Sequence, residues 1–369
     1  MEFTARKDVL LKELSLIQGI VERRNTIPVL ANVLIEATES HVDLAATDLD
    51  VGLRCRFSAD VKDPGALTIS AKKLFEIARA VSETEIVIKE LENYWAQIIC
   101  GRSYFKMVGL SKTEFPALPE PPEEPMAVLP GALVREVIQR TSFAITADDS
   151  RYFLNGARLE IDGKHVRMIA TDGHRLAYIS IEQENSSDKK ASVIVPKKTL
   201  LELVKMLSES DDEVEFSEGE NHLFFRLGER LLVSKRVDDQ FPAYEKVIPK
   251  GNDKIVVFGR EQILGAIRRV CLLANERSRA VRLSIESGKV EVSSQNPELG
   301  EAREEVEVDY AGEAVQIGFN GQYLIDFLSV AGTDKILLEL KNDSSQGLLK
   351  PADLEETKDY QYVVMPMRL

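Results

Sequence analysis

The sequence predicts an α+β protein of three similar tandem domains, each with two helices packed on antiparallel sheets. Its 369 residues are too many for one compact core, so two or three domains are expected. Short motifs recur along the chain, and every copy contains two segments with the apolar spacing of a helix. Runs of alternating polar and apolar residues occupy much of the rest, as in strands with one buried face.

The repeats are visible in two short motifs. Phe-Pro-Ala at 115–117 returns 126 positions later at 241–243, and Ala-Thr-Asp at 46–48 returns 124 positions later at 170–172. A weaker third copy places Asn296 in phase with the second motif. This period is far longer than the roughly 20–50 residues of a solenoid unit, so each copy is expected to be a domain.

Proline-rich stretches mark the expected boundaries between these domains. They lie at 114–125 and 241–253, close to the ends of the first and second copies. The expected domains are residues 1–122, 126–250 and 251–369.

Each domain is expected to contain two amphipathic helices, with a short strand before the first. Ser70 and Asn320 are suitable N-caps for second helices, and Pro196 suits a first helical turn. The helical segments are 10–21, 70–81, 132–145, 195–207, 262–274 and 319–331, the preceding strands are 1–4, 126–129 and 254–258, and further clear strands are 85–91, 222–235 and 335–340.

Composition and cysteine usage indicate a soluble protein of the cytoplasm. Apolar residues make up 44% and charged residues 29% of the chain, and no apolar run approaches the roughly 20 residues that span a bilayer. The charged N-terminal segment does not resemble a signal peptide. Three widely separated cysteines, Cys55, Cys100 and Cys271, argue against a disulfide framework and against a zinc site.

Catalytic and cofactor motifs are scarce in this sequence. There is no GxxxxGK[ST] phosphate loop and no dinucleotide-binding glycine pattern, so neither a nucleotide cofactor nor a metal is expected. Asp48 and Asp50 follow a strand and leave open a metal-dependent phosphatase. The equivalent positions of the later copies do not keep the second carboxylate, which favours a structural turn. His174 has no nucleophile or metal-ligand partner at the expected spacing, so the protein is not predicted to be an enzyme.

The distribution of charge is more informative than its sum of −14. Taken by segment, the six helical stretches carry about +8 and the rest of the chain about −22. Helices often expose basic residues, so the pattern fits either ordinary solvation or a helical surface that faces a polyanion. The C-terminal run YVVMPMRL is apolar where chain ends are usually polar, which fits a last core strand or a groove for apolar peptides.

Several longer motifs resemble one family over the whole chain. RYFLNG at 151–156, ATDGHRLA at 170–177, FPAY at 241–244 and the terminal YVVMPMRL are similar to the bacterial replicative sliding clamp, the beta subunit of DNA polymerase III. The resemblance implies the DNA-clamp fold in a head-to-tail homodimer, which closes into a six-domain ring around duplex DNA. The expected function is a processivity factor that tethers the replicative polymerase during DNA replication.

The resemblance also implies three sets of site residues. The partners of its peptide-binding cleft would be short linear motifs of the polymerase III alpha subunit, the clamp loader, translesion polymerases and repair proteins. The implied cleft residues are Leu154, Thr171, Gly173, His174, Arg175, Leu176, Pro242, Val247, Val364, Met365, Pro366, Met367 and Arg368. The implied DNA-binding residues are Arg24, Lys72, Tyr152 and Phe153. The implied dimer interface joins Lys73, Arg102, Phe105 and Met107 to Leu272, Leu273, Glu301, Glu304 and Glu305.

Overall fold

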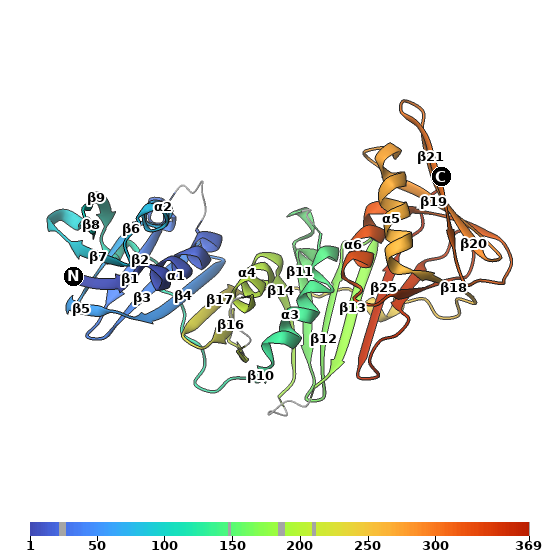
Figure 1. Cartoon of the computed structure of the whole chain (residues 1–369). Helices are drawn as coiled ribbons and strands as arrows, with labels where there is room; N and C mark the ends of the chain where they lie inside the picture. Colours follow the sequence, from blue (N-terminus) through green and yellow to red (C-terminus); the bar gives the residue numbers. More distant parts are fainter. Residues whose placement is uncertain (22–26, 147–148, 184–188, 209–211, 369) are drawn as a thin grey trace. The chain divides into compact units, whose positions relative to one another are not determined.

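A computed structural model describes residues 1–21, 27–146, 149–183, 189–208 and 212–368 (Figure 1). The chain forms two compact units, and each consists of two stretches of sequence. Unit 1 contains Met1–Val134 and Lys198–Arg236, and unit 2 contains Arg135–Lys197 and Val237–Leu369. The middle repeat therefore contributes residues to both units.

Unit 1 is built on one mixed-length antiparallel sheet that joins strands of the first and second repeats. The strand order is β10-β15-β16-β17-β4-β3-β2-β6-β9-β8-β7-β1-β5. The strands are β1 Glu2–Arg6, β2 Asn32–Ala37, β3 His41–Thr47, β4 Val51–Ser58, β5 Asp60–Asp63, β6 Gly65–Ser70, β7 Glu85–Glu90, β8 Trp95–Cys100, β9 Ser103–Leu110, β10 Ala127–Leu129, β15 Val214–Glu218, β16 His222–Leu227 and β17 Arg230–Lys235.

Unit 2 contains two antiparallel sheets, ordered β14-β11-β12-β13-β25-β24-β23-β18 and β21-β20-β19-β22. Strands of the second and third repeats share the larger sheet. The strands are β11 Gly156–Ile161, β12 His165–Thr171, β13 Arg175–Glu182, β14 Ala191–Pro196, β18 Lys254–Gly259, β19 Ala280–Glu286, β20 Lys289–Asn296, β21 Gly300–Glu307, β22 Val315–Asn320, β23 Lys335–Leu340, β24 Gly347–Pro351 and β25 Lys358–Val364.

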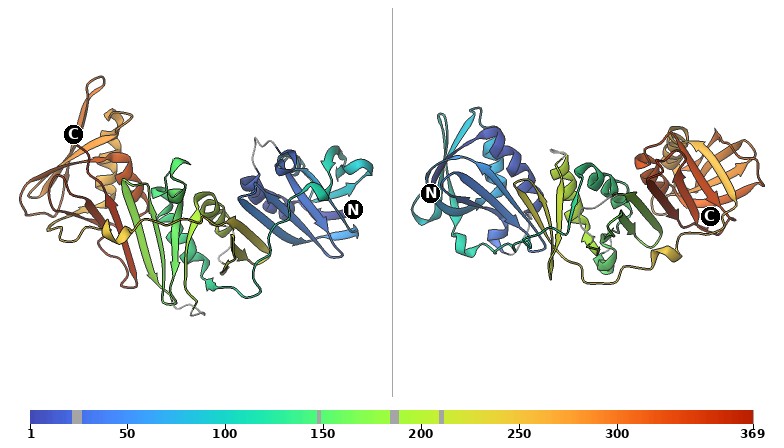
Figure 2. Two further views of the ribbon diagram at one scale, coloured as in Figure 1. Left: turned by 180° about the vertical axis from the view of Figure 1, so that it is seen from behind. Right: turned by 90° about the horizontal axis from the view of Figure 1, so that it is seen from below.

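The described residues contain two α-helices for each repeat, as the apolar spacing predicts. Figures 1 and 2 show α1 and α2 side by side on the strands of the first repeat, and α5 and α6 form a similar pair in unit 2. None of these helices is long and apolar enough to cross a membrane. The helices are α1 Lys7–Ile20, α2 Ala71–Ala80, α3 Gly131–Gln139, α4 Lys197–Leu207, α5 Arg260–Val270 and α6 Gly321–Val330.

The helix ends follow local hydrogen bonding more closely than apolar spacing. Ser70 caps α2 by accepting from the Lys73 N–H at 3.4 Å, and Asn320 caps α6 by accepting from the Gln322 N–H at 2.9 Å, which confirms both predicted caps. Pro196 ends strand β14 and precedes α4, so its prediction within the first helical turn was wrong by one residue. The predicted first helices of the second and third repeats extend too far, because each ends in a separate 3-10 turn, Ser142–Ala144 and Cys271–Leu273.

Strand pairing joins consecutive repeats in the same way in both units. In unit 1, β4 of the first repeat pairs antiparallel with β17 of the second, from Val51 opposite Ser234 to Cys55 opposite Arg230. In unit 2, β13 of the second repeat pairs antiparallel with β25 of the third. The backbone N–H and C=O groups of these strand edges are therefore satisfied inside the chain.

Buried ion pairs reinforce the contact between repeats in unit 1. Arg230 of the second repeat donates two hydrogen bonds to the Glu13 carboxylate on α1, at 2.6 and 2.8 Å, and only about a tenth of each side chain is exposed. Lys198, on α4, donates to the Asp48 carboxylate and to the Ile20 carbonyl. A charge buried this far depends strongly on its partner.

We expect Arg230→Met to lower the free energy of unfolding of unit 1 by about 3 kcal/mol, because Glu13 then remains buried without its partner. The double variant Glu13→Leu, Arg230→Met removes both charges and should regain most of that loss. Urea denaturation followed by circular dichroism measures both effects. Arg54→Met, which breaks an exposed pair with Glu120, is the matched control and should cost less than about 1 kcal/mol. Equal destabilisation by Arg54→Met and Arg230→Met would contradict this account.

Candidate functional site

The second Ala-Thr-Asp motif ends strand β12 in a tight turn. The Asp172 Oδ1 atom accepts hydrogen bonds from the N–H groups of His174 at 2.9 Å and Arg175 at 3.1 Å. The Thr171 hydroxyl accepts from the Gly173 N–H, and Gly173 has a φ of 88°, a left-handed conformation that favours glycine. The turn leaves the His174 side chain exposed and directs the chain into β13.

The first copy of the motif forms the same turn, which explains the two carboxylates that suggested a phosphatase. Asp48 Oδ1 accepts from the N–H groups of Asp50 at 2.9 Å and Val51 at 2.6 Å, and Asp48 Oδ2 accepts from Lys198. Asp48 is therefore a turn and ion-pair residue, and Asp50 lies exposed near Lys235. No group of three potential metal-ligating side chains occurs among the described residues. The phosphatase alternative has no support.

Arg175, the first residue of β13 after this turn, holds the second and third repeats together. Its guanidinium donates to Asp172 at 3.0 Å, to Asp326 on α6 at 2.6 Å and to the Phe143 carbonyl at 2.6 Å, and it lies 4.3 Å from the centre of the Tyr323 ring. Burial opposes the charge, but the neighbouring Tyr362 and the two carboxylates outweigh it and raise the pKa of Arg175. Each of its three side-chain nitrogens donates to a partner within the fold, so Arg175 positions the turn.

The C-terminal segment lies beside this turn. Strand β25 pairs with β13, with Val364 opposite Arg175, and the Met365 N–H donates to the His174 carbonyl at 2.9 Å. Further along, the Met367 N–H donates to the Gly318 carbonyl at 2.8 Å, which fixes the segment against strand β22. The fold thus brings residues 171–176 and 363–368 together.

The cleft residues implied by the resemblance divide into a buried floor and an accessible surface. Leu154, Thr171, Leu176 and Val364 are each less than a tenth exposed. Pro242 belongs to the Phe-Pro-Ala-Tyr stretch at 241–244 and Val247 follows it. Phe241 and Tyr244 of that stretch pack in a core cluster with Leu176, Val363 and Leu348. The accessible members are Gly173, His174, Pro242, Val247, Met365, Pro366, Met367 and Arg368.

Two hollows open at the end of the C-terminal segment. One has a volume of about 460 Å³ and the other of about 670 Å³, and both are lined in part by Met367 and Arg368. Much of their remaining wall comes from the sheet β21-β20-β19-β22, including Arg282, which the sequence analysis did not single out, and the loop residues Ser278, Asp343 and Ser344 also contribute. Only the strand register shows which residues of this sheet face the C-terminal segment.

The predicted DNA-binding residues lie in both units and on the surface. Lys72 is exposed on α2 of unit 1, where Glu76 is 3.9 Å away. In unit 2, Tyr152 is 61% exposed and meets Phe153 edge to face at a centroid distance of 6.1 Å. Asp239 accepts a hydrogen bond from the Tyr152 hydroxyl and thereby raises the pKa of Tyr152. The Tyr152 hydroxyl is neutral at pH 7. Arg24 lies outside the described residues.

The predicted interface residues cluster around two strand edges. In unit 1, Phe105 and Met107 are half-buried on β9. Arg102 is exposed just before β9, and Lys73 is exposed on α2. In unit 2, Leu272 is 77% exposed and Leu273 is half-buried. Strand alternation separates the three predicted interface acids on β21, since Glu304 accepts hydrogen bonds from Arg269 at 2.5 and 2.8 Å whereas Glu301 and Glu305 face the other side.

Strand β9 also carries two exposed apolar side chains that the sequence analysis did not predict. Tyr104 and Val108 on β9 are 58% and 64% exposed. Residues 103–110 alternate only weakly in polarity, and this pattern does not predict a strand face that is both apolar and uncovered.

Replacing Arg175 tests its positioning role. Arg175→Met should lower the free energy of unfolding of unit 2 by about 3 kcal/mol, because Asp172 and Asp326 lose their shared guanidinium. Arg175→Lys should restore only part of the loss, since an ammonium group cannot reach three partners in one plane. Thermal and urea denaturation measure the effect, with the exposed Arg277→Met as control. If Arg175→Met matched the control, the network would not support the turn.

Comparison with known proteins agrees with this geometry over the whole chain. Three family models match in order, the DNA polymerase III beta subunit N-terminal domain at residues 1–119, its central domain at 128–243 and its C-terminal domain at 245–368.

Individual relatives match at full length. The beta sliding clamp of Pseudomonas aeruginosa is 41% identical and that of Escherichia coli is 35% identical, each covering 100% of both chains. The crystal structure of the DNA polymerase III subunit beta from Pseudomonas aeruginosa superposes with a TM-score of 0.94 at 40% identity and covers 100% of both chains. The chain has the three-domain sliding clamp fold, and it belongs to the DNA polymerase III beta subunit family, the bacterial beta sliding clamps.

Proposed function

We propose that this sliding clamp works as a head-to-tail dimer that closes into a ring around duplex DNA. The observation that carries the proposal is the strand pairing between repeats. Strands β4 and β13, which follow the Asp48 and Asp172 turns, each pair with the last strand of the next repeat, β17 or β25. In the third repeat, β21 corresponds to β4 and β13, because it follows the equivalent Asn296 turn. In the first repeat, β9 corresponds to β17 and β25, because it is the last strand.

Strands β21 and β9 lack the corresponding partner within the described residues. Strand β21 pairs only with β20 and forms the edge of its sheet. Strand β9 pairs with β8 along its length, but on its other side only Gly109 and Leu110 meet β6. Pairing β21 of one copy with β9 of another would repeat the contact that already joins consecutive domains. Two such contacts between two copies close a ring of six similar domains.

Side-chain chemistry at these edges supports the pairing. Glu301 and Glu305 supply negative charge on β21, and Lys73 and Arg102 supply positive charge in unit 1. Phe105, Met107, Leu272 and Leu273 supply apolar surface that a second copy would cover. We propose that these residues form the dimer interface, with domain boundaries near residues 122 and 250.

The distribution of charge supports passage of DNA through the ring. The helical segments carry about +8, whereas the rest of the chain carries about −22. Weak attraction by the helices and repulsion elsewhere would favour DNA inside the ring, and few tight phosphate contacts would leave it free to slide. We propose that Arg24, Lys72, Tyr152 and Phe153 lie near the DNA.

The surface around His174, Met365 and Met367 supports a second role as a docking cleft for linear peptides. Adaptable methionines beside rigid Pro366 and half-buried Val247 suit apolar peptide side chains. We propose that the cleft residues named above bind Gln- and Leu/Phe-containing motifs of polymerase III alpha, the clamp loader, translesion polymerases and repair proteins. The clamp would thereby tether a polymerase as a non-catalytic subunit. We place this role in the cytoplasm, which suits three cysteines that form no disulfide bond, Cys55, Cys100 and Cys271.

Topological retention on DNA tests the ring. After loading onto a nicked circular plasmid by a clamp loader with ATP, the protein should co-elute with the plasmid in gel filtration. Cutting the plasmid once should release it, because a ring slides off free ends while a tight binder does not. Retention that persists after cutting would refute enclosure, and absence of loading by an active loader would refute the clamp function.

Charging the apolar interface should produce monomers. Leu273→Asp would place a carboxylate in the apolar part of the proposed contact with β9 of the second copy, where burial opposes its charge. Light scattering at low micromolar concentration should then give the monomer mass. Leu201→Asp, which charges an exposed leucine on α4, is the matched control and should remain dimeric. A dimeric Leu273→Asp variant would show that the interface is assigned to the wrong surface.

A further inference from the structure

A polar groove continues from the C-terminal segment across the four-stranded sheet of unit 2. The two hollows of about 460 and 670 Å³ share three lining residues, Arg282, Met367 and Arg368. One hollow extends over strands β20 and β21, and the other extends along β22 toward Ser344. Because they share these residues, the two hollows adjoin.

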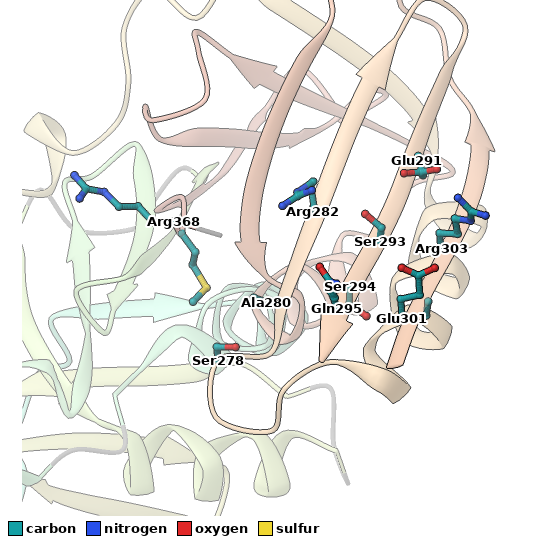
Figure 3. A pocket seen from close by; sticks show the side chains of 12 residues that line it. Ser278, Ala280, Arg282, Glu291, Ser293, Ser294, Gln295, Glu301, Arg303 and Arg368 are labelled. Carbon is teal, nitrogen blue, oxygen red and sulfur yellow. The ribbon is translucent and has the colours of Figure 1, made fainter. Parts of the chain in front are cut away.

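The floor of this groove is a row of residues paired across the sheet. Met367 bridges Gly318, Gly318 lies opposite Arg282, Arg282 opposite Ser293, and Ser293 opposite Arg303. Paired residues on neighbouring strands face the same side of a sheet. Gly318 has no side chain and Ser293 has a short one, so the row is low on both sides of Arg282. Figure 3 shows Arg282 and Arg303 on either side of Ser293.

The other face of the sheet is already occupied, so the groove lies on the only free face at these positions of the described unit. Val292 and Ser294 flank Ser293 in sequence and point to the opposite side, where both are buried. The Ser294 hydroxyl donates to the Val270 carbonyl at the end of α5 at 2.9 Å. The groove is therefore a surface formed by the fold, with α5 behind it.

Three guanidinium groups in the groove, those of Arg303, Arg282 and Arg368, have no ion-pair partner among the described residues. Arg282 and Arg368, which line both hollows, do not lie within 4.0 Å of a carboxylate there, and both are exposed. Other arginines of the same unit are paired, such as Arg269 with Glu304 and Arg175 with Asp326. Glu291, Glu301 and Asp343 also line the hollows, but they leave these two guanidiniums free to bind a carboxylate.

We infer that Arg282 forms a carboxylate subsite for acidic residues that flank the apolar motif of a bound partner peptide, with Arg368 as a separate guanidinium at the cleft end of the groove (Figure 3). This inference rests on the proposed peptide cleft. Met367 and Arg368 line the groove and also belong to that cleft, so a peptide chain in the cleft reaches Arg282 without leaving the surface. An acidic flank would add charge-assisted hydrogen bonds to the apolar contacts and would raise the selectivity for partners that carry it.

Matched fluorescent peptides test the subsite on the intact protein. One peptide contains the Gln- and Leu/Phe-containing core with neutral flanks, and two others carry Asp and Glu residues either before or after the same core. Fluorescence polarisation at about 50 mM salt should show that one acidic peptide binds roughly three- to tenfold more tightly than the neutral one, with the difference shrinking as salt is added.

Arg282→Gln is the decisive variant, because Arg282 lies on the interior strand β19 and outside the cleft and the interface proposed above. It should abolish the preference for the acidic peptide and leave binding of the neutral peptide unchanged. Arg277→Gln, which is exposed and lines neither hollow, should keep the preference. An equal preference in wild type and Arg282→Gln, or none in wild type, would overturn the subsite. Failure of wild type to bind the neutral peptide would instead overturn the cleft.

Discussion

Antiparallel pairing between consecutive repeats is the constraint on which the rest of the structure depends. A strand edge left open exposes a row of unsatisfied backbone groups, and a chain of repeats has such an edge at every junction. Here β4 accepts β17 and β13 accepts β25, so each junction becomes part of a larger sheet. Each compact unit consequently combines one terminal repeat with part of the middle repeat. Strands β21 and β9, which occupy the corresponding positions in the last and first repeats, lack such a partner among the described residues, and we propose that they pair between two copies.

The turn that precedes each pairing strand serves the junction and the binding surface together. Asp48 and Asp172 both fold the backbone with one carboxylate oxygen and hold a basic side chain with the other. In unit 1 that base is Lys198 on the helix of the next repeat, and in unit 2 it is Arg175, which continues to Asp326 on α6. The same rigid anchoring orients the exposed His174 beside Met365. A docking surface built on a buried network loses little conformational entropy when a peptide binds.

Charge is arranged for enclosure more than for tight binding. The net charge of −14 would disfavour an open, high-affinity DNA site, because such sites usually leave a basic footprint. A ring needs no such footprint, since it is retained on DNA by topology, and a modest positive bias on the helices keeps sliding unhindered. The polar groove around Arg282 shows the complementary use of charge, where exposed guanidiniums select the sequence that flanks an apolar anchor.

The sequence alone determined the three-fold repeat, the two helices of each copy, the caps at Ser70 and Asn320 and, through its longer motifs, the family. These features depend on local periodicity and short-range hydrogen bonds, which neighbouring residues specify. Only the tertiary structure shows that two of the helices end before 3-10 turns, at Ser142–Ala144 and Cys271–Leu273. The two-unit organisation and the role of Arg175 in positioning the Asp172 turn also required it. The row from Met367 through Gly318 and Arg282 to Ser293 required it as well, because its members lie far apart in the chain. Only the register of strands, set by packing over the whole sheet, places such residues on one face.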